Sequence, residues 1–351
     1  MKKGIKIVLA VAAIAVLAIG IIAFFTMKSN IKNSSSNTSE GELNIPVEMN
    51  LQLDKILNPE SVKGKSLKEI REYLNSQFSK WSSEPIPFTN IKNTNIDATY
   101  GKIPVRIYTP EGGGSYPVII YAHGGCWVSG SVDGYEGVCR KLSQKSKAIV
   151  ISVGYRLAPD NPFPAAVTDV YNVLLWAGKN AKSINGNENK LIVAGDSAGG
   201  NIAAAVTQMA RDKNGPRPIC QVLIYPAANI KDLNTPSWTY IQNKYIITRQ
   251  NLEEYISMYV PKVEDRKNPY ASPLLANNFA NLSDALIITA EIDPLRDEGE
   301  AYGEKLKEAG VQVQVTRYNG VPHGFISMDK ITDKAEEALN EIASYIQKKS
   351  S

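Results

Sequence analysis

The sequence predicts an α/β fold in which a mostly parallel sheet is covered by helices on both faces. From Gly101 onward, short apolar runs typical of strands alternate with longer runs typical of helices, which is the pattern of this architecture. A serine flanked by glycines, Ser197, lies where one such strand meets the next helix. The chain has 351 residues, of which 43% are hydrophobic, so it can bury one large core and still carry additional segments.

Residues 1–28 predict a membrane anchor. Three lysines precede an uncharged run, Ile7 to Met27, and Lys28 closes it. The run has 21 residues, close to the roughly 20 that a helix needs to span a bilayer. A cleaved signal peptide is the alternative, but its apolar core is usually only about 7–15 residues long and ends at a small-residue cleavage site. The basic start favours a cytoplasmic N-terminus. We therefore expect a single-pass protein of the cell membrane with its α/β domain outside the cytoplasm, or else a secreted protein.

Two further segments precede the catalytic domain. Residues 29–41 are polar and of low complexity, so they cannot form a core and are predicted to be a linker. Residues 42–95 are predicted to form a helical cap segment, because apolar residues such as Leu67, Ile70 and Leu74 recur at helical spacing.

Residues 96–351 are predicted to be the catalytic domain. Its strands are expected at 103–109, 117–122, 148–153, 190–195, 219–225, 285–290 and 311–318. Its helices are expected at 135–146, 164–180, 198–212, 250–260, 297–309 and 332–348. An insertion at about 226–284 is rich in aromatic residues, which form either a second part of the cap or ordinary core.

Ser197 has the setting of a catalytic nucleophile. It lies in a hexapeptide that follows an apolar run and opens a helix-like run, Gly195-Asp196-Ser197-Ala198-Gly199-Gly200. The glycines permit a tight strand-to-helix turn that exposes the hydroxyl, and the helix N-terminus behind it favours negative charge. A serine in this setting can attack an acyl carbon.

The chain contains two histidines, and His323 is predicted to be the base. A serine nucleophile needs a base that titrates near neutral pH, which histidine provides. His323 comes 126 residues after Ser197, in a loop bounded by proline and glycine. His123 precedes the serine and is followed by two glycines. We expect His123 to shape its loop through hydrogen bonds.

The acid is predicted to be Asp293. Enzymes with a serine on this kind of turn place the acid between serine and histidine along the chain. Asp293 follows the strand-like run 285–290, and catalytic groups of open α/β sheets lie at the carboxyl ends of strands. It would orient the imidazole and stabilise its protonated form. Glu291 and Asp297 are the alternatives.

Backbone N–H groups are the expected donors to the oxyanion that forms during acyl transfer. The loop after strand 117–122 and the turn after Ser197 can supply them. The candidates are Gly124, Gly125, Cys126 and Ala198.

These motifs together resemble the hormone-sensitive-lipase-like family of α/β-hydrolases, which includes bacterial carboxylesterases and arylacetamide deacetylases. The matching segments are His123-Gly124-Gly125-Cys126-Trp127, Tyr155-Arg156-Leu157-Ala158-Pro159, Pro162-Phe163-Pro164-Ala165-Ala166, Gly195 to Gly200, Ala271-Ser272-Pro273-Leu274, Asp293 to Glu298 and His323-Gly324-Phe325. The resemblance implies an α/β-hydrolase fold, hydrolysis of small to medium acyl esters through an acyl-serine, and no cofactor or metal. It also implies that N-terminal helices cover the active site. Cys126 departs from the family, which usually has glycine there.

Alternatives to a serine carboxylesterase remain open. Within the family they are a polysaccharide or xylan acetyl esterase and a lipase-like enzyme. From other classes they are a non-catalytic ligand-binding module and a serine peptidase. The net charge of +4 is too small and too scattered to indicate nucleic-acid binding. The expected partners are therefore a small ester and, through residues 1–28, the membrane. Cys126, Cys139 and Cys220 could include one disulfide, which the sequence does not decide.

Overall fold

A computed structural model describes residues 47, 64–241 and 248–351 of the chain. Its centre is an eight-stranded sheet with the order β1-β2-β4-β3-β5-β6-β7-β8. The strands are β1 (Asn90–Ala98), β2 (Gly101–Thr109), β3 (Tyr116–Ala122), β4 (Ile149–Val153), β5 (Gly186–Asp196), β6 (Cys220–Ile224), β7 (Asp284–Ile292) and β8 (Val313–Pro322). From β4 across to β8 every neighbouring pair is parallel, whereas β1 and β2 pair antiparallel. The predicted α/β class with a mostly parallel sheet is confirmed.

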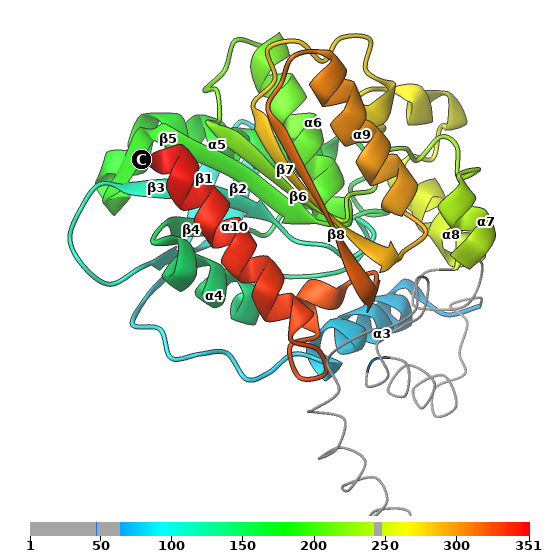
Figure 1. Ribbon diagram of the computed structural model, residues 1–351, viewed down its shortest axis with the longest axis horizontal. Coiled ribbons are helices and arrows are strands. Elements are labelled where there is room, and N and C mark those ends of the chain that lie inside the picture. Colours follow the sequence, from blue (N-terminus) through cyan, green and yellow to red (C-terminus); the bar gives the residue numbers. More distant parts are fainter. Residues whose placement is uncertain (1–46, 48–63, 242–247) are drawn as a thin grey trace, which may run out of the picture.

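Helices cover both faces of this sheet (Figure 1). The helices on one face are α4 (Glu136–Ser146) and α10 (Lys334–Ser350), and those on the other are α5 (Ala165–Asn180), α6 (Ala198–Asp212) and α9 (Arg296–Glu308). Helices α3 (Leu67–Lys80), α7 (Pro236–Ile241) and α8 (Arg249–Tyr259) lie near the carboxyl ends of the strands (Figure 1). The apolar residues of α5, α6 and α9 belong to one buried cluster, and those of α4 and α10 belong to another. The sheet therefore separates two cores.

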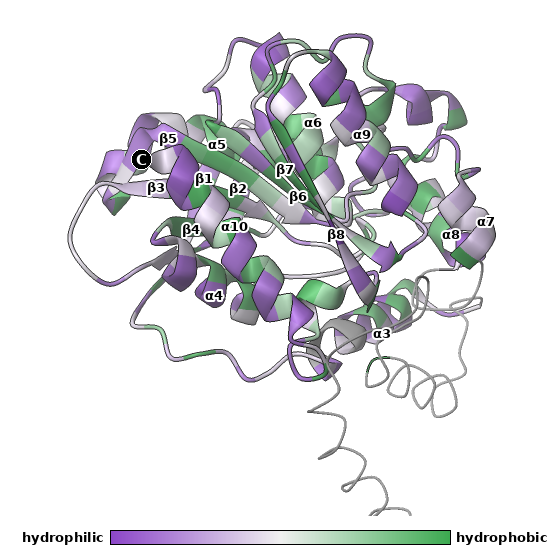
Figure 2. Ribbon diagram, in the orientation of Figure 1, coloured by the Kyte–Doolittle hydropathy of each residue, from purple (hydrophilic) through white to green (hydrophobic). Residues whose placement is uncertain are grey.

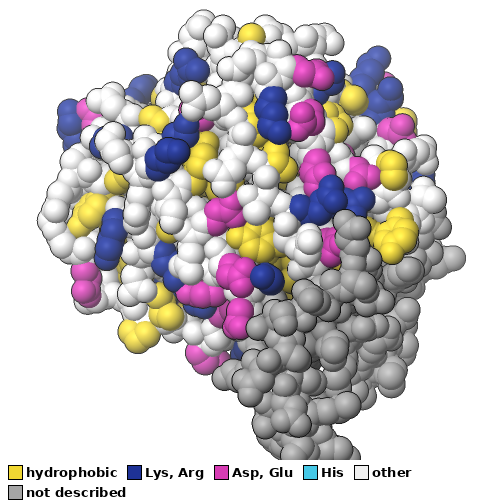
Figure 3. All heavy atoms as spheres, in the orientation of Figure 1, with side chains coloured by type: hydrophobic (Ala, Val, Ile, Leu, Met, Phe, Trp, Pro, Cys, Tyr) yellow, Lys and Arg dark blue, Asp and Glu magenta, His cyan; other side chains and the backbone are white. Residues whose placement is uncertain are grey.

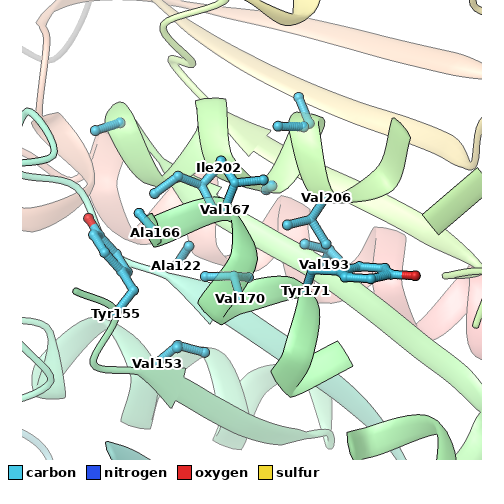
Figure 4. Close-up of a cluster of buried hydrophobic side chains, with 14 of the residues drawn as sticks. Ala122, Val153, Tyr155, Ala166, Val167, Val170, Tyr171, Val193, Ile202 and Val206 are labelled. Atoms are coloured by element: carbon cyan, nitrogen blue, oxygen red, sulfur yellow. The ribbon is translucent and has the colours of Figure 1, made fainter. Parts of the chain in front are cut away.

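Strand β3 shows how one strand serves both cores. Val118, Ile120 and Ala122 pack in the cluster with α5 and α6, while Ile119 and Tyr121 pack in the cluster with α4 and α10. Neighbouring side chains of a strand point to opposite faces, so a strand covered on both sides needs a continuous apolar run. Figure 2 shows the central strands as the most hydrophobic part of the molecule, and Figure 4 shows the packing around Val167, Val170 and Ile202.

Strand β1 overlaps the end of the segment 42–95 that was predicted to be helical. It begins at Asn90 and pairs with β2 through a short turn at Thr99 and Tyr100. The prediction was wrong at residues 90–95, and the reason is that β1 is an edge strand. Of its residues only Ile96 is fully buried, so the strand lacks the apolar pattern of the inner strands.

The insertion between β6 and β7 contains α7 and α8. Three of its aromatic side chains, Trp238, Tyr255 and Tyr259, are buried in the core. Tyr240 is 57% exposed. Core packing is therefore the correct interpretation for the first three. Tyr245 lies outside the described residues.

The predicted anchor, residues 1–28, and the predicted linker, residues 29–41, also lie outside the described residues. Within the ranges that the structure does describe, no helix is both long and apolar enough to cross a bilayer. Acidic and basic side chains are intermingled over the face shown in Figure 3. Cys126, Cys139 and Cys220 are free thiols.

Candidate active site

The turn between β5 and α6 holds Ser197 in an unusual backbone conformation. Its φ is 56° and its ψ is −120°, so it departs from both flanking elements. Glycine is required around it because the backbone passes very close. A Cβ on Gly199 would lie 2.0 Å from the carbonyl oxygen of Ala122, and one on Gly195 would lie 2.4 Å from the carbonyl oxygen of Gly199. The turn therefore projects the Ser197 hydroxyl at the carboxyl end of the sheet.

The structure brings Ser197, His323 and Asp293 together in one chain of hydrogen bonds. The Ser197 hydroxyl lies 2.8 Å from His323 Nε2, and His323 Nδ1 lies 2.7 Å from Asp293 Oδ2. A carboxylate can only accept, so Nδ1 carries the proton and Nε2 is left to accept from the serine. Asp293 is completely buried, while Ser197 and His323 each retain 7% exposure. This arrangement can activate a serine for attack.

The two alternative acids are engaged elsewhere. Glu291 accepts a hydrogen bond from the backbone N–H of Gly320 through its Oε2, at 2.8 Å. Asp297 accepts one from the N–H of Ser237, at 2.7 Å, and pairs with Arg296. The other oxygen of Asp293 accepts from the N–H of Leu295, at 2.9 Å, which fixes the carboxylate in its loop.

Asp196, beside the nucleophile, joins β5 to the loop that follows β3, residues 123–130, which we call the glycine loop. Its Oδ1 accepts from the Tyr121 hydroxyl at 2.8 Å and from the N–H of Gly124 at 2.9 Å, and its Oδ2 accepts from the Tyr135 hydroxyl at 2.9 Å. Burial raises the pKa of this carboxyl from 3.8 to about 6, although its three donors oppose the shift. Sequence reasoning did not assign Asp196 a role, because its partners lie 61 to 75 residues earlier in the chain.

The hydrogen bond to Asp196 changes the set of oxyanion donors. It occupies the N–H of Gly124, so this amide is turned toward the carboxylate. Gly125, Cys126 and Ala198 remain as candidates. Ala198 is the first residue of α6, where N–H groups have no partner within the helix. The amides of Gly125 and Cys126 have no hydrogen bond to any other residue that the structure describes.

The glycine loop is a tight turn in an uncommon conformation. Gly125, Cys126 and Trp127 all have positive φ, at 120°, 54° and 62°. The carbonyl of Gly125 accepts from the N–H groups of both Val128 and Ser129. Cys126 therefore occupies a position whose backbone favours glycine, which accounts for glycine in the family at this point.

His123 is buried away from the nucleophile. Its ring stacks between Tyr135 and Tyr155, with centroid distances of 5.5 and 4.3 Å. Its Nδ1 donates to the carbonyl of Gly124 at 2.7 Å, and the Tyr155 hydroxyl donates to the backbone carbonyl of His123 at 2.7 Å. Burial lowers the pKa of His123 to about 4, so the ring is neutral near pH 7. These contacts agree with a role in shaping the loop.

Trp127 ties the glycine loop to the helices around it. Its ring stacks on Tyr259 of α8, with centroids 4.7 Å apart and planes 4° from parallel. Its Nε1 donates to Asn201 of α6 at 3.2 Å, and the amide of Asn201 donates to the carbonyls of Ala227 and Ala271. No short sequence motif connects these residues, because the contacts come from separate elements.

An open groove of about 670 Å³ lies beside α8. Its apolar lining comes from Pro159, Pro162, Met258 and Pro261, and Glu253 and Glu254 lie at its side. None of the three residues in the Ser197 hydrogen-bond chain contributes to it. We therefore do not assign this groove to the chemistry. In the described ranges no cluster of histidine, cysteine and acidic residues could hold a metal ion.

Comparisons with known proteins place the chain in a family. The family described as alpha/beta hydrolase fold matches residues 119–327. The carboxylesterase NlhH of Mycobacterium tuberculosis is 40% identical over 240 residues, covering 67% of this chain and 75% of that protein. The ethyl acetate hydrolase of Pseudomonas putida is 34% identical over 270 residues, covering 76% and 84%. A hyperthermophilic esterase from the archaeon Pyrobaculum calidifontis superimposes with a TM-score of 0.84 and 38% identity, covering 88% of this chain and 99% of that one. The chain therefore belongs to the hormone-sensitive-lipase-like family of the α/β-hydrolases.

Proposed function

We propose that the protein is a serine carboxylesterase that hydrolyses small to medium acyl esters through an acyl-serine intermediate. The observation that carries this proposal is the continuous chain from Ser197 through His323 to the buried Asp293, with distances of 2.8 and 2.7 Å. Relatives that are carboxylic ester hydrolases support the enzyme class.

The geometry supports the following reaction. Ser197 Oγ attacks the ester carbonyl while His323 Nε2 takes its proton. The carbonyl oxygen becomes negative and is stabilised by N–H groups from Gly125, Cys126 and Ala198, of which two or three are used. His323 then gives its proton to the leaving alcohol, and the acyl group stays on Ser197. Water, deprotonated by the same imidazole, releases the acid and restores the serine.

The size of the acyl group is proposed from two considerations. Cys126 is half-buried, and we expect its side chain to narrow the space beside the reacting carbon, which glycine would leave open. The relative named for ethyl acetate acts on a small ester. Both favour short acyl chains over long lipids.

The test is a panel of p-nitrophenyl esters of increasing acyl length, with a peptide anilide as the competing substrate. We expect turnover of acetate and butyrate esters and none of the anilide. Ser197→Ala should remove the activity. Efficient cleavage of the anilide, or ester hydrolysis that survives Ser197→Ala, would show that the proposal is wrong.

We also propose that residues 1–28 anchor the protein in the cell membrane with the catalytic domain outside the cytoplasm. The uncharged run from Ile7 to Met27 supports this, because its partitioning into the bilayer depends on hydrophobic burial. The full chain should then sediment with membranes and resist extraction by high salt. A soluble mature form that begins near residue 28 would instead indicate a cleaved signal peptide.

A further inference from the structure

We propose that Arg71 of α3 is a positioning residue that holds the glycine loop in its oxyanion-binding conformation. This inference rests on the esterase function proposed above. It gives α3 a part in transition-state stabilisation.

Arg71 reaches the glycine loop through two kinds of contact. Its Nε donates to the carbonyl of Val128 at 2.9 Å. Its terminal NH2 group donates to the carbonyl of Ala158 at 3.1 Å and to Asp160 Oδ2 at 2.6 Å. Val128 lies two residues after Cys126, and Ala158 itself donates its N–H to the carbonyl of Trp127 at 2.9 Å. The Arg71 guanidinium therefore binds both the end of the glycine loop at Val128 and the neighbouring segment 158–160.

A second residue of α3 contacts the same loop one turn further along the helix. Asn75 Oδ1 accepts from the N–H of Gly130 at 2.9 Å. Arg71 and Asn75 are four residues apart, so they lie on the same side of α3. Together they contact the loop on both sides of Ser129.

The loop depends on such contacts from outside. Positive φ at two consecutive residues other than glycine, Cys126 and Trp127, is costly, and strained backbone persists only where the surroundings hold it. At the end of β5, Asp196 holds the start of the loop by accepting from the N–H of Gly124. From α8 and α6, Tyr259 and Asn201 hold Trp127. Arg71 holds the end of the turn, which these contacts do not reach.

A plain surface ion pair does not explain the placement of Arg71. Asp160 has 57% of its side chain exposed, and exposed pairs stabilise proteins by only about 0–1 kcal/mol. The bonds to Val128 and Ala158 are different, because they join a charged donor to part-buried carbonyls. Their effect is expected on loop geometry more than on global stability.

The experiment compares Arg71→Met and Arg71→Lys in the full chain, with p-nitrophenyl acetate as substrate. Loss of one oxyanion donor costs about 10²–10³-fold in kcat, and a misplacement of about 1 Å costs about 10²-fold. We expect Arg71→Met to lower kcat by about 10–100-fold with KM changed less than about threefold. Arg71→Lys should recover part of the loss, because one ammonium can reach one of the carbonyls but lacks the planar fork.

A second measurement is the affinity for a methyl trifluoromethyl ketone, whose carbonyl adds Ser197 and forms an oxyanion. It should weaken by the same factor as kcat/KM. Arg140→Met is the matched control, since Arg140 also joins a backbone carbonyl, that of Ile86, to a carboxylate, that of Glu136. It should leave both values within about twofold, as expected of a residue outside the site. Asn75→Ala and Asn75→Asp form a second pair with smaller expected effects. Asn75→Ala removes the acceptor for the N–H of Gly130 and should lower kcat, whereas Asn75→Asp keeps an acceptor oxygen and should not.

The outcomes separate the two proposals. If Arg71→Met is folded and keeps kcat within about threefold, or if it changes KM alone, Arg71 does not position the loop. Equal losses in Arg71→Met and Arg140→Met would also overturn the inference. If Arg71→Met does not fold, the Asn75 pair decides: equal kcat in both variants overturns it. If the unchanged protein neither binds the ketone nor loses activity on Ser197→Ala, the esterase proposal itself fails.

Discussion

Ser197 combines a reactive side chain with a backbone conformation that is costly for any residue but glycine. Strained backbone is retained where it has a function. Here it places the Ser197 hydroxyl beside His323 and leaves the N–H of Ala198 next to the nucleophile. The position of the Ser197 hydroxyl therefore depends on the backbone dihedral angles of this one residue.

The first prediction concerns the three residues of the hydrogen-bond chain. Ser197→Ala and His323→Ala should each lower kcat/KM by about 10⁴-fold or more, and the double variant should be little worse than either, because the residues act as one unit. Asp293→Asn should cost about 10³–10⁴-fold, because it removes the acceptor that fixes the imidazole tautomer. Steady-state kinetics on a p-nitrophenyl ester would measure this. Asp297→Asn is the control, and a larger loss there would mean that the acid is assigned wrongly.

The second prediction concerns Cys126. Burial raises the pKa of its thiol to about 12, so the thiol is neutral at pH 7 and is not a nucleophile. Cys126→Ala should therefore keep most of the activity. Cys126→Gly should relieve the positive φ of 54° and shift the preference toward bulkier acyl groups. An ester panel and thermal unfolding would show both effects. Inactivity of folded Cys126→Ala would contradict this account.

The third prediction concerns His123 and pH. Since its pKa is lowered to about 4, His123 is already neutral at pH 5 and above and contributes no ionisation to the rate there. His123→Asn keeps a donor for the carbonyl of Gly124. It should lower kcat through the loop but leave the shape of the pH–rate profile between pH 5 and 9 unchanged. A shifted acidic limb in this variant would show that His123 titrates during catalysis.

At this scale the sequence was informative wherever a residue type alone indicates chemistry. Ser197, His323 and Asp293 could be predicted because each lies in a short recognisable turn, and the structure places them in contact. Gly124 was predicted as a donor but its N–H bonds to Asp196. That difference depends on the direction of one peptide plane, which the glycine pattern does not specify.

At the scale of elements, the junction of β5 with α6 is tightly constrained. Gly199 packs directly on the carboxyl end of β3, which is how the helix comes close enough to present Ser197 beside the glycine loop. The two elements therefore fix the distance between the nucleophile and its oxyanion donors.

The fourth prediction tests this packing. In Gly199→Ala the new Cβ would lie 2.0 Å from the carbonyl oxygen of Ala122, so the helix must move. We expect a loss of at least about 2 kcal/mol in the free energy of unfolding together with a large loss of activity. Gly137→Ala in α4 is the matched control, because its Cβ meets no atom within 4 Å. That variant should be unchanged or stabilised by up to about 1 kcal/mol. Denaturant unfolding and kinetics would compare the two.

Inner elements could be predicted from the sequence better than peripheral ones. Every predicted strand between residues 103 and 318 has a counterpart in the sheet. In β3 to β7 the reason is burial on both faces, which leaves a continuous apolar run. Strand β1 and the short helix α7 were not predicted. Both lie at the periphery, where half of each element faces solvent or another segment and the apolar period is lost.

At the scale of the whole molecule, the buried carboxyl of Asp196 links one core of the domain to the active-site loop. Its tyrosine partners belong to the core formed with α4 and α10, while Gly124 belongs to the active-site loop. The stability of the entire domain should therefore respond to pH through this group.

The fifth prediction gives the sign of that response. The folded-state pKa of Asp196, about 6, lies above 3.8, so folding favours the protonated form. Its contribution is fully present below about pH 4 and is lost as the pH rises through 6, by an amount on the order of 3 kcal/mol. Asp196→Asn cannot ionise. Its free energy of unfolding relative to that of the unchanged protein should therefore rise between pH 4 and 7, as measured by denaturant titration. A difference independent of pH would contradict the raised pKa.

The positions of Ser197, Asp293 and His323 have a consequence for the order of events in folding. They follow β5, β7 and β8, and the two hydrogen-bonded side chains of Ser197 and His323 are separated by 126 residues. Parallel pairing between distant segments forms slowly compared with local helices. Enzymatic activity can therefore return during refolding only after the last strand, β8, has joined the sheet. Recovery of activity would thus measure when the C-terminal half is complete, whereas recovery of helix content would not.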